Sequence, residues 1–363
     1  MFDFPGPQVP EPPTGRTRHP YFMHDMIRRQ SVAAQATFRA TVEQLANEPF
    51  APPGRLLYVG QGTSFHAAWA AQRSAEPVLA ASLPRAFSSF DVVTADHPVG
   101  EGVTAVVFSA SGDTALTIAA QRRLRKEGAR VLLITASPQG RSREEADAIV
   151  TTQYADETSW AHTVSFTAGL VAAGALLDHW AGRKPEPGEE ELVGEVVNAA
   201  LASENTMLDL VEAFATKDNL LLLGSGDCAP AAREGALKLR EAAGRFCATA
   251  GVEEFLHGVL PSVGPRSGVI ALSRSPTERT RAAHGLAAAA QVGASTLLLD
   301  ASGGPPGERV VSVPVAPRPP PAALLVIPLQ LLAYWMATSE GRNPDVMGLD
   351  DPRYLAARSS FGI

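Results

Sequence analysis

One segment of the chain places three charged side chains where they could perform acid–base chemistry. Glu234, Lys238 and Glu241 are spaced by four and then three residues, so on an α-helix they lie on one face. A carboxylate whose pKa is raised by burial can move a proton at a carbon next to a carbonyl group. The imidazole of His257, further along the chain, can donate or accept a proton near neutral pH. Because the same spacing is typical of a solvated, ion-paired helix surface, the spacing alone leaves both interpretations open.

Two turns rich in hydroxyl groups could bind an anion. The first is Gly62-Thr63-Ser64 and the second runs from Ser109 to Thr114, and each follows an apolar run. Where a strand turns into a helix, free backbone amides and the helix dipole favour a negatively charged group such as phosphate. Helix capping is the alternative, because Ser, Asp and Thr are common N-cap residues. The glycine inside the second turn and the presence of two such turns favour phosphate binding.

These groups must be positioned by strands and helices that alternate along the chain. The segments Leu56–Val59 and Leu220–Leu223 are apolar, and each leads into a Gly-x-Gly turn and a helix-compatible stretch. This pattern is typical of a buried parallel strand that enters a helix, and its repetition predicts a tandem α/β protein. The other predicted strands, with helices such as Thr114–Glu127 between them, are Val103–Phe108, Val131–Thr135, Ala148–Thr152, Val269–Leu272, Thr296–Asp300 and Val310–Val315.

Proline and glycine divide the chain into four parts. We expect a proline-rich N-terminal arm over residues 1–18, a first domain over 19–188, a second domain over 189–341 and a C-terminal tail over 342–363. The predicted connector, 183–190, contains two prolines among charged residues. The helices predicted on either side of it, about 163–182 and 189–215, could belong to either domain. At 363 residues the chain is long enough for each domain to bury its own core.

Composition narrows the classes of partner. A formal net charge of −7 argues against nucleic acid, which needs a basic face, but backbone amides can still hold a small phosphorylated ligand. Cys228 and Cys247 lack the spacing of metal ligands and are expected to be reduced core residues. The apolar stretch 322–337 contains Pro328 and is shorter than the roughly 20 residues of a membrane span, so we expect a buried helix. No signal-peptide pattern is recognised, and we expect a cytoplasmic protein without a membrane partner.

Four ordered motifs resemble the sugar isomerase (SIS) domain family, and within it the isomerase half of glucosamine-6-phosphate synthase and its stand-alone relatives. The similarity covers about residues 19–355. The matching segments are Gly62-Thr63-Ser64, Ser109 to Thr114, Glu234 to Glu241 and Glu254 to Gly258. The resemblance implies two tandem, doubly wound parallel sheets of the flavodoxin-like type, packed about a pseudo-two-fold axis. The active site is then expected at the carboxyl ends of the strands.

The resemblance also implies roles for individual residues. Glu241 would be the base that moves a proton between C1 and C2 of an open-chain hexose phosphate, with Lys238 beside it. His257 would assist ring opening, reaching in from the neighbouring subunit of a homodimer. The substrate and its phosphate would be held by Gly62, Thr63, Ser64, Ser109, Ala110, Ser111, Gly112, Thr114, His162 and Thr163. No metal or organic cofactor is expected, because proton transfer needs only a base, an acid and charge stabilisation.

At several positions the chain departs from the family pattern. His162 and Val164 replace a serine and a lysine, and Ala110 replaces a glutamine of the synthase. Ala357 stands where the synthase tail has the lysine that engages the ketose carbonyl. Arg358 follows one position later, but it stays protonated and cannot form a Schiff base.

These departures favour the breakdown of an amino sugar over its synthesis. Residue 2 is Phe and no glutaminase segment precedes the first domain, so ammonia release from glutamine is not expected. We predict an amino-sugar-phosphate isomerase that deaminates a hexosamine 6-phosphate through an enediol or enolamine. A deglycase that splits a phosphorylated fructosamine or its amino-acid conjugate is the alternative, because it would use the same base. A non-catalytic phosphosugar sensor is a third hypothesis, although such regulators typically carry a helix-turn-helix reader, which is not evident here.

Overall fold

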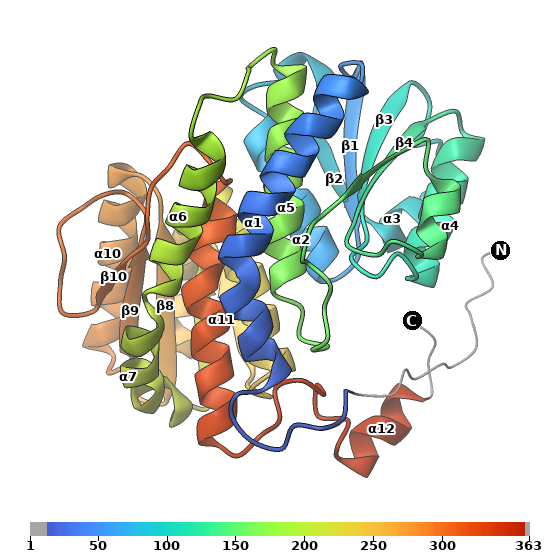
Figure 1. Ribbon diagram of the computed structural model, residues 1–363. Coiled ribbons are helices and arrows are strands. Elements are labelled where there is room, and N and C mark those ends of the chain that lie inside the picture. The colour runs from blue at the N-terminus through green and yellow to red at the C-terminus, as the bar shows by residue number, and fades with distance from the viewer. Residues whose placement is uncertain (1–12, 360–363) are drawn as a thin grey trace.

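The computed structural model describes residues 13–359 and contains two parallel β-sheets of five strands each. The strand order is β2-β1-β3-β4-β5 in the first sheet and β10-β9-β8-β6-β7 in the second. Counted from the first strand of each repeat, both orders are 2-1-3-4-5, which is the doubly wound, flavodoxin-like order. All pairings between neighbouring strands of the two sheets are parallel. The predicted tandem α/β fold is therefore confirmed (Figure 1).

The strands agree closely with the sequence prediction. Those of the first sheet are β1 (Arg55–Gly60), β2 (Arg85–Ser88), β3 (Val103–Phe108), β4 (Arg130–Thr135) and β5 (Ala148–Thr151). Those of the second are β6 (Asn219–Leu223), β7 (Cys247–Ala250), β8 (Ser267–Ser273), β9 (Ser295–Asp300) and β10 (Val310–Ser312). Of the four edge strands, β5 and β10 were predicted, whereas β2 and β7 were not. Both are short, and the Cys-Ala-Thr-Ala sequence of β7 lacks the branched and aromatic residues that identify a strand.

Helices follow the strands and also form a separate layer. In chain order they are α1 (Phe22–Asn47), α2 (Thr63–Ala75), α3 (Ser89–Thr94), α4 (Ala115–Lys126), α5 (Val164–Trp180), α6 (Glu189–Leu201), α7 (Glu204–Ala215), α8 (Ala229–Glu241), α9 (Val252–Glu254), α10 (Pro276–Gln291), α11 (Pro321–Ser339) and α12 (Pro352–Arg358). The single helix predicted over 189–215 is two helices. The helix is interrupted between Leu201 and Glu204, and at this turn the Ser203 hydroxyl donates a hydrogen bond to the Ala200 carbonyl.

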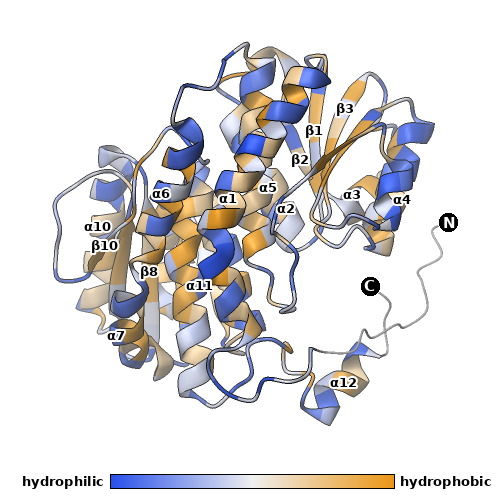
Figure 2. Cartoon of the chain, viewed as in Figure 1, coloured by the Kyte–Doolittle hydropathy of each residue, from blue (hydrophilic) through white to orange (hydrophobic). Residues whose placement is uncertain are grey.

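The two repeats share one helical layer and one large core. Helices α1, α5, α6 and α11 lie between the sheets (Figure 1), and a single hydrophobic cluster includes Tyr58 of β1 and Leu222 of β6. The prediction that each domain buries a core of its own is thus incomplete. Among the described residues, α11 alone is long and apolar enough to cross a membrane, but 83% of its most apolar window is buried, as expected of a core helix. Figure 2 shows hydrophobic residues along the strands and hydrophilic ones on outer helices such as α4.

The strand order brings the two hydroxyl turns to one edge of the first sheet. Strand β1 lies between β2 and β3, and ligands of doubly wound folds bind where neighbouring connections leave a sheet in opposite directions. At the end of β1, a Cβ on Gly60 would lie 2.4 Å from the backbone carbonyl of Ser64, so this close turn requires glycine. The β1–α2 and β3–α4 turns consequently place Ser64 and Ser109 at the same crevice.

Candidate active site

A chain of buried charges runs along one face of α8. The Lys238 ammonium lies 3.3 Å from the Glu234 carboxylate and forms a second ion pair with Glu241. The side chains of Lys238 and Glu234 are fully buried, and that of Glu241 is 15% exposed. The alternative of a solvated helix surface is therefore wrong for this face of α8.

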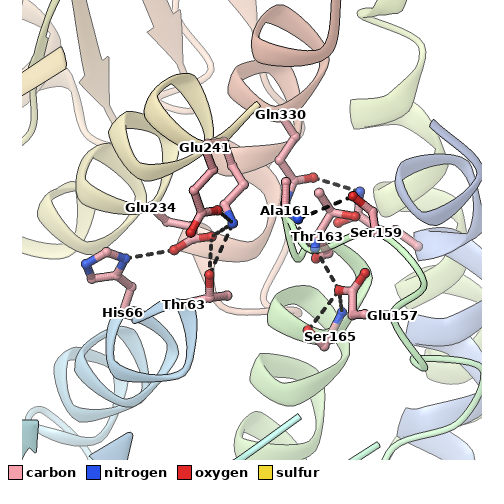
Figure 3. A network of polar contacts seen from close by, with 12 residues as sticks. Thr63, His66, Glu157, Ser159, Ala161, Thr163, Ser165, Glu234, Glu241 and Gln330 are labelled. Carbon is pink, nitrogen blue, oxygen red and sulfur yellow. Dashed lines mark hydrogen bonds and ion pairs between the residues drawn. The ribbon is translucent and has the colours of Figure 1, made fainter. Parts of the chain in front are cut away.

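Helix α2 of the first repeat completes this polar network. The Thr63 hydroxyl donates to Glu234 over 3.0 Å and accepts from Lys238 over 3.2 Å. His66 Nδ1 lies 2.7 Å from the other oxygen of Glu234, and Figure 3 shows both α2 side chains directed at that carboxylate. The network thus joins the two repeats. Sequence reasoning missed His66, because its partner is 168 residues away.

Burial and neighbouring charges give the two carboxyl groups of α8 opposite pKa shifts. Burial raises the pKa of Glu241, and the opposing effect of Lys238 does not cancel that rise. Burial alone would also raise the pKa of Glu234. The charges and hydrogen bonds of Lys238, His66 and Thr63 outweigh this effect, so the pKa of Glu234 is lowered. Although burial alone would lower the pKa of Lys238, the two carboxylates raise it. Because its pKa is raised, Glu241 is the carboxyl group of this pair better suited to take up and return a proton.

A small cavity rich in hydroxyl groups lies at the carboxyl ends of β1, β3, β4 and β5. Its polar lining comes from Thr63, Ser64, Ser109, Thr135, Thr152 and Ser165. The Ser109 hydroxyl is buried and has no hydrogen-bond partner among the described residues. Such a group costs about 1–3 kcal/mol when it stays unpaired, and an anionic oxygen would satisfy it. The cavity therefore has the chemistry expected of a phosphate site.

Only part of the predicted phosphate loop lines this cavity. Ala110 does so, whereas Ser111 is exposed and accepts a hydrogen bond from the Asp113 amide. Thr114 occupies the N-cap position of α4 without a side-chain capping bond. Gly112 has a positive φ of 70°, and a Cβ there would lie 2.9 Å from the Cα of Gly140. In the first turn, Gly62 likewise has a positive φ, of 58°.

Glu157 organises the loop that leads from β5 into α5, and sequence reasoning missed it. One carboxylate oxygen accepts from the Thr163 and Ser165 amides over 2.7 and 2.8 Å and from the Ser165 hydroxyl over 2.8 Å (Figure 3). The other oxygen is buried without a hydrogen-bond partner among the described residues. Burial raises the pKa of Glu157 to about 7 in spite of these hydrogen bonds. A lone acidic residue in a polar loop carries no sequence pattern that distinguishes it.

Of the other predicted site residues, His162 and Thr163 are buried, whereas His257 is exposed. Burial, and after it the charge of Lys238, lower the pKa of His162 to about 4, so its imidazole is neutral near pH 7 beside the network. Thr163 is fully buried, and its hydroxyl has no partner in the described part of the chain. His257 lies in a short π-helical turn, Phe255–Val259, with 78% of its side chain exposed, and its ring is 3.5 Å from Glu253. Within one subunit His257 is not part of the Glu241 network, and its role from a neighbouring subunit stays a prediction.

Known proteins share this architecture. The glutamine–fructose-6-phosphate aminotransferase (isomerizing) of Zymomonas mobilis is 27% identical over 365 residues, which cover 94% of this chain and 59% of that protein. The chain therefore spans less than two thirds of that curated relative. The C-terminal domain of glucosamine-fructose-6-phosphate aminotransferase from Francisella tularensis has a TM-score of 0.78 at 21% identity, covering 92% of this chain and 100% of that domain.

A second solved structure and a family model extend the comparison. Glucosamine-6-phosphate deaminase from Thermotoga maritima has a TM-score of 0.74 at 23% identity and covers 89% of this chain and 96% of its own. At these identities, both solved structures show a shared fold. The model of the SIS domain matches residues 50–178 and 213–339, and these two segments contain the two parallel sheets. The chain belongs to the SIS domain family.

Proposed function

We propose that the protein is a phosphosugar isomerase that releases an amine from an open-chain amino-sugar 6-phosphate, with Glu241 as its base. The placement of Glu241 carries this proposal. Its carboxyl group has a raised pKa and is paired to Lys238, which also contacts Thr63 in the wall of the hydroxyl cavity. A sugar whose phosphate occupies that cavity would extend its first carbons towards Glu241.

The reaction needs only groups that this chain supplies, together with water. With a hexosamine 6-phosphate, Glu241 takes the proton from C2 and forms an enolamine, and the same carboxyl group then protonates C1. Water adds to the resulting imine at C2, the carbon–nitrogen bond breaks, and ammonia and a ketohexose 6-phosphate leave. Lys238 stays protonated throughout and supplies a fixed positive charge beside the developing enolate. No step requires a metal or an organic cofactor.

Two observations support amine release in particular. Similar proteins are named as an isomerizing aminotransferase and a glucosamine-6-phosphate deaminase. In this chain Ala357 replaces the tail lysine expected of a synthase, and this replacement favours breakdown over synthesis. We also predict that the protein forms a homodimer and that it is located in the cytoplasm.

A phosphorylated fructosamine is the second candidate substrate. Glu241 would then take the proton from C1 and return it to C2, and the amine would leave from C1. One observation favours this substrate: the Cζ atom of the partly buried Arg358 lies 5.4 Å from the ring centroid of Trp160, next to the segment that contains His162, where a cation could attract the acidic group of a fructose–amino acid.

Product analysis tests the proposal. The enzyme and its Glu241→Gln variant are incubated separately with glucosamine 6-phosphate and with a fructose–amino acid 6-phosphate, and ammonia, free amino acid and hexose phosphate are measured. Ammonia with a ketohexose phosphate supports the deaminase, and free amino acid with an aldose phosphate supports the deglycase. If neither substrate is converted while calorimetry detects hexose-phosphate binding, the sensor hypothesis replaces the enzyme.

A further inference from the structure

The C-terminal ends of α1 and α5, which lie side by side, border a further cavity of about 560 Å³ (Figure 1). Its apolar wall is one face of α1, on which the lining residues Phe38, Val42, Leu45 and Ala46 follow the helical spacing. The polar side chains of the lining come from the end of α5, the turn after it and the loop before α11, and they are Asp178, His179, Arg183, Lys184 and Arg318. A cavity of this size, with an apolar wall and a few polar groups, is typical of a small-molecule site.

This cavity is separate from the candidate active site. Ser165 and Gly169 of α5 line the hydroxyl cavity, whereas Ala175 and Asp178, further along the same helix, line this one. At about 1.5 Å per residue, Ser165 and Asp178 are roughly 20 Å apart along α5. No residue lines both cavities. A molecule bound in one of them would therefore leave the other accessible.

Backbone hydrogen bonds hold the turn that carries Arg183 and Lys184. The Gly182 amide donates to the His179 carbonyl over 3.1 Å, and Gly182 has a positive φ of 71°, as is common where a helix ends. The Arg183 amide donates to the Asp178 carbonyl over 2.8 Å. These hydrogen bonds satisfy carbonyl groups at the end of α5 that would otherwise favour a cation. The turn thus places its own cations at the cavity.

The cavity has one positive charge that the described chain does not neutralise. Arg318 forms ion pairs with Asp178 and, over 3.0 Å, with Glu189. Arg183 is also paired with Glu189. The third cation of the lining is Lys184, whose ammonium group has no hydrogen bond or ion pair with residues 13–359. Three cations therefore face two carboxylates, and a single negative charge on a ligand would balance them.

We propose that this cavity binds a monocarboxylate with an apolar chain, of the medium-chain fatty acid type. The chain would pack against the face of α1 that contains Val42, and the carboxylate would pair with Lys184. A carboxylate matches one unbalanced positive charge, whereas a phosphate monoester carries about −1.5 to −2 charges at pH 7. Each methylene group that leaves water should strengthen binding about fourfold. The site does not depend on the proposed function of Glu241.

Calorimetric titration with octanoate, 1-octanol and hexanoate tests the charge and the chain separately. We expect one octanoate per chain, with 1-octanol about tenfold weaker because it lacks the charge. Hexanoate, which is two methylene groups shorter, should bind roughly 15-fold more weakly than octanoate. Lys184→Gln should weaken octanoate binding about tenfold and leave 1-octanol binding within about twofold of the wild type. Lys184→Arg should keep most of the preference for octanoate.

Two further variants separate the cavity from general surface binding. Ala46 is exposed and lines the cavity, so Ala46→Phe should fill it and weaken octanoate and 1-octanol alike. Lys126→Gln is the control, because Lys126 is an exposed lysine of α4 outside the lining, and it should bind octanoate as the wild type does.

Three outcomes would overturn the proposal. Equal affinity for octanoate and 1-octanol would exclude a carboxylate site. Octanoate binding that is unchanged in Ala46→Phe or in Lys184→Gln would place the ligand elsewhere on the protein. Displacement of octanoate by saturating glucosamine 6-phosphate would place it in the candidate active site, whereas unchanged octanoate affinity in the presence of that sugar supports a separate cavity.

Discussion

Lys238 and Glu241 form an ion pair at the end of α8, and the Lys238 side chain has no exposure to solvent. The same ammonium lies 3.3 Å from Glu234, so one buried cation serves two carboxylates. Their pKa shifts differ because Glu234 contacts Thr63 and His66 in addition to Lys238, and together these groups lower its pKa. At Glu241, Lys238 opposes the effect of burial without cancelling it, so the pKa stays raised. Because of these different environments, we expect Glu241 and not Glu234 to exchange a proton with the substrate.

Glu241→Gln should abolish most of the turnover and leave phosphosugar binding intact. Glutamine keeps the shape of the side chain but cannot take up a proton, so we expect kcat to fall by about 10²–10⁴-fold. Turnover and calorimetric affinity are measured side by side. Glu195→Gln, at an exposed glutamate on α6, is the matched control. Near-normal turnover by Glu241→Gln would contradict the mechanism.

Lys238→Met should shift the pH dependence of the reaction. Without the cation that opposes the pKa rise, the pKa of Glu241 increases further. Activity needs the ionised base, so as the pH is lowered the variant should lose activity at a higher pH than the wild type does. The acidic limb of the kcat/KM profile measures this shift. Because the buried carboxylates are left unpaired, the free energy of unfolding should also fall by about 3–5 kcal/mol. An unmoved acidic limb would show that Lys238 does not tune the base.

Ser109→Ala should weaken substrate binding without weakening the fold. The variant removes a buried hydroxyl that has no protein partner in the described chain, so the free energy of unfolding should stay the same or rise. The KM for a phosphosugar should increase about tenfold if that hydroxyl binds phosphate. Ser111→Ala tests the rest of the predicted loop, because Ser111 does not line the cavity. A destabilised Ser109→Ala with unchanged KM would indicate a structural hydroxyl.

Glu157 should make the protein less stable as the pH rises from about 4.5 to about 7. The pKa of Glu157 is raised from 4.5 in the unfolded chain to about 7 in the folded protein. The protonated carboxyl group therefore makes its full contribution to the free energy of unfolding below pH 4.5. That contribution, up to about 3 kcal/mol, is lost as the pH rises through 7. Glu157→Gln keeps the accepting oxygen and cannot ionise. Urea unfolding at pH 5 and pH 7.5 should therefore show a smaller difference for the variant, and equal differences would contradict the prediction.

His257→Asn tests the expected homodimer. If His257 enters the site of a neighbouring subunit, this variant and Glu241→Gln should each be inactive alone. Subunits of the two variants, unfolded together and refolded as a mixture, should recover activity, because a hybrid dimer contains one intact site. Light scattering checks the assembly. A mixture that stays inactive while containing hybrid dimers would show that His257 does not act from the neighbouring subunit. An active His257→Asn variant would place His257 outside the reaction.

The sequence by itself determined the elements and the order of the motifs. Apolar runs such as Leu56–Val59 and Val103–Phe108 identified strands because strand and helix formation depends on local periodicity. The same local rule placed Glu234, Lys238 and Glu241 on one helix face. Strand β7 escaped this rule, because its Cys-Ala-Thr-Ala sequence lacks the run of branched and aromatic residues that identified the other strands.

Only the tertiary structure decided what that helix face contacts. The docking of α2 on α8 buries the charges and brings His66 to Glu234, and the folding back of the tail sets Arg358 over Trp160. Burial and pairing of this kind depend on residues far apart in the chain, and no local pattern contains them. The exposed position of His257 has the same origin. The family motifs identify the residues of the site, whereas their protonation states follow from which surfaces pack together.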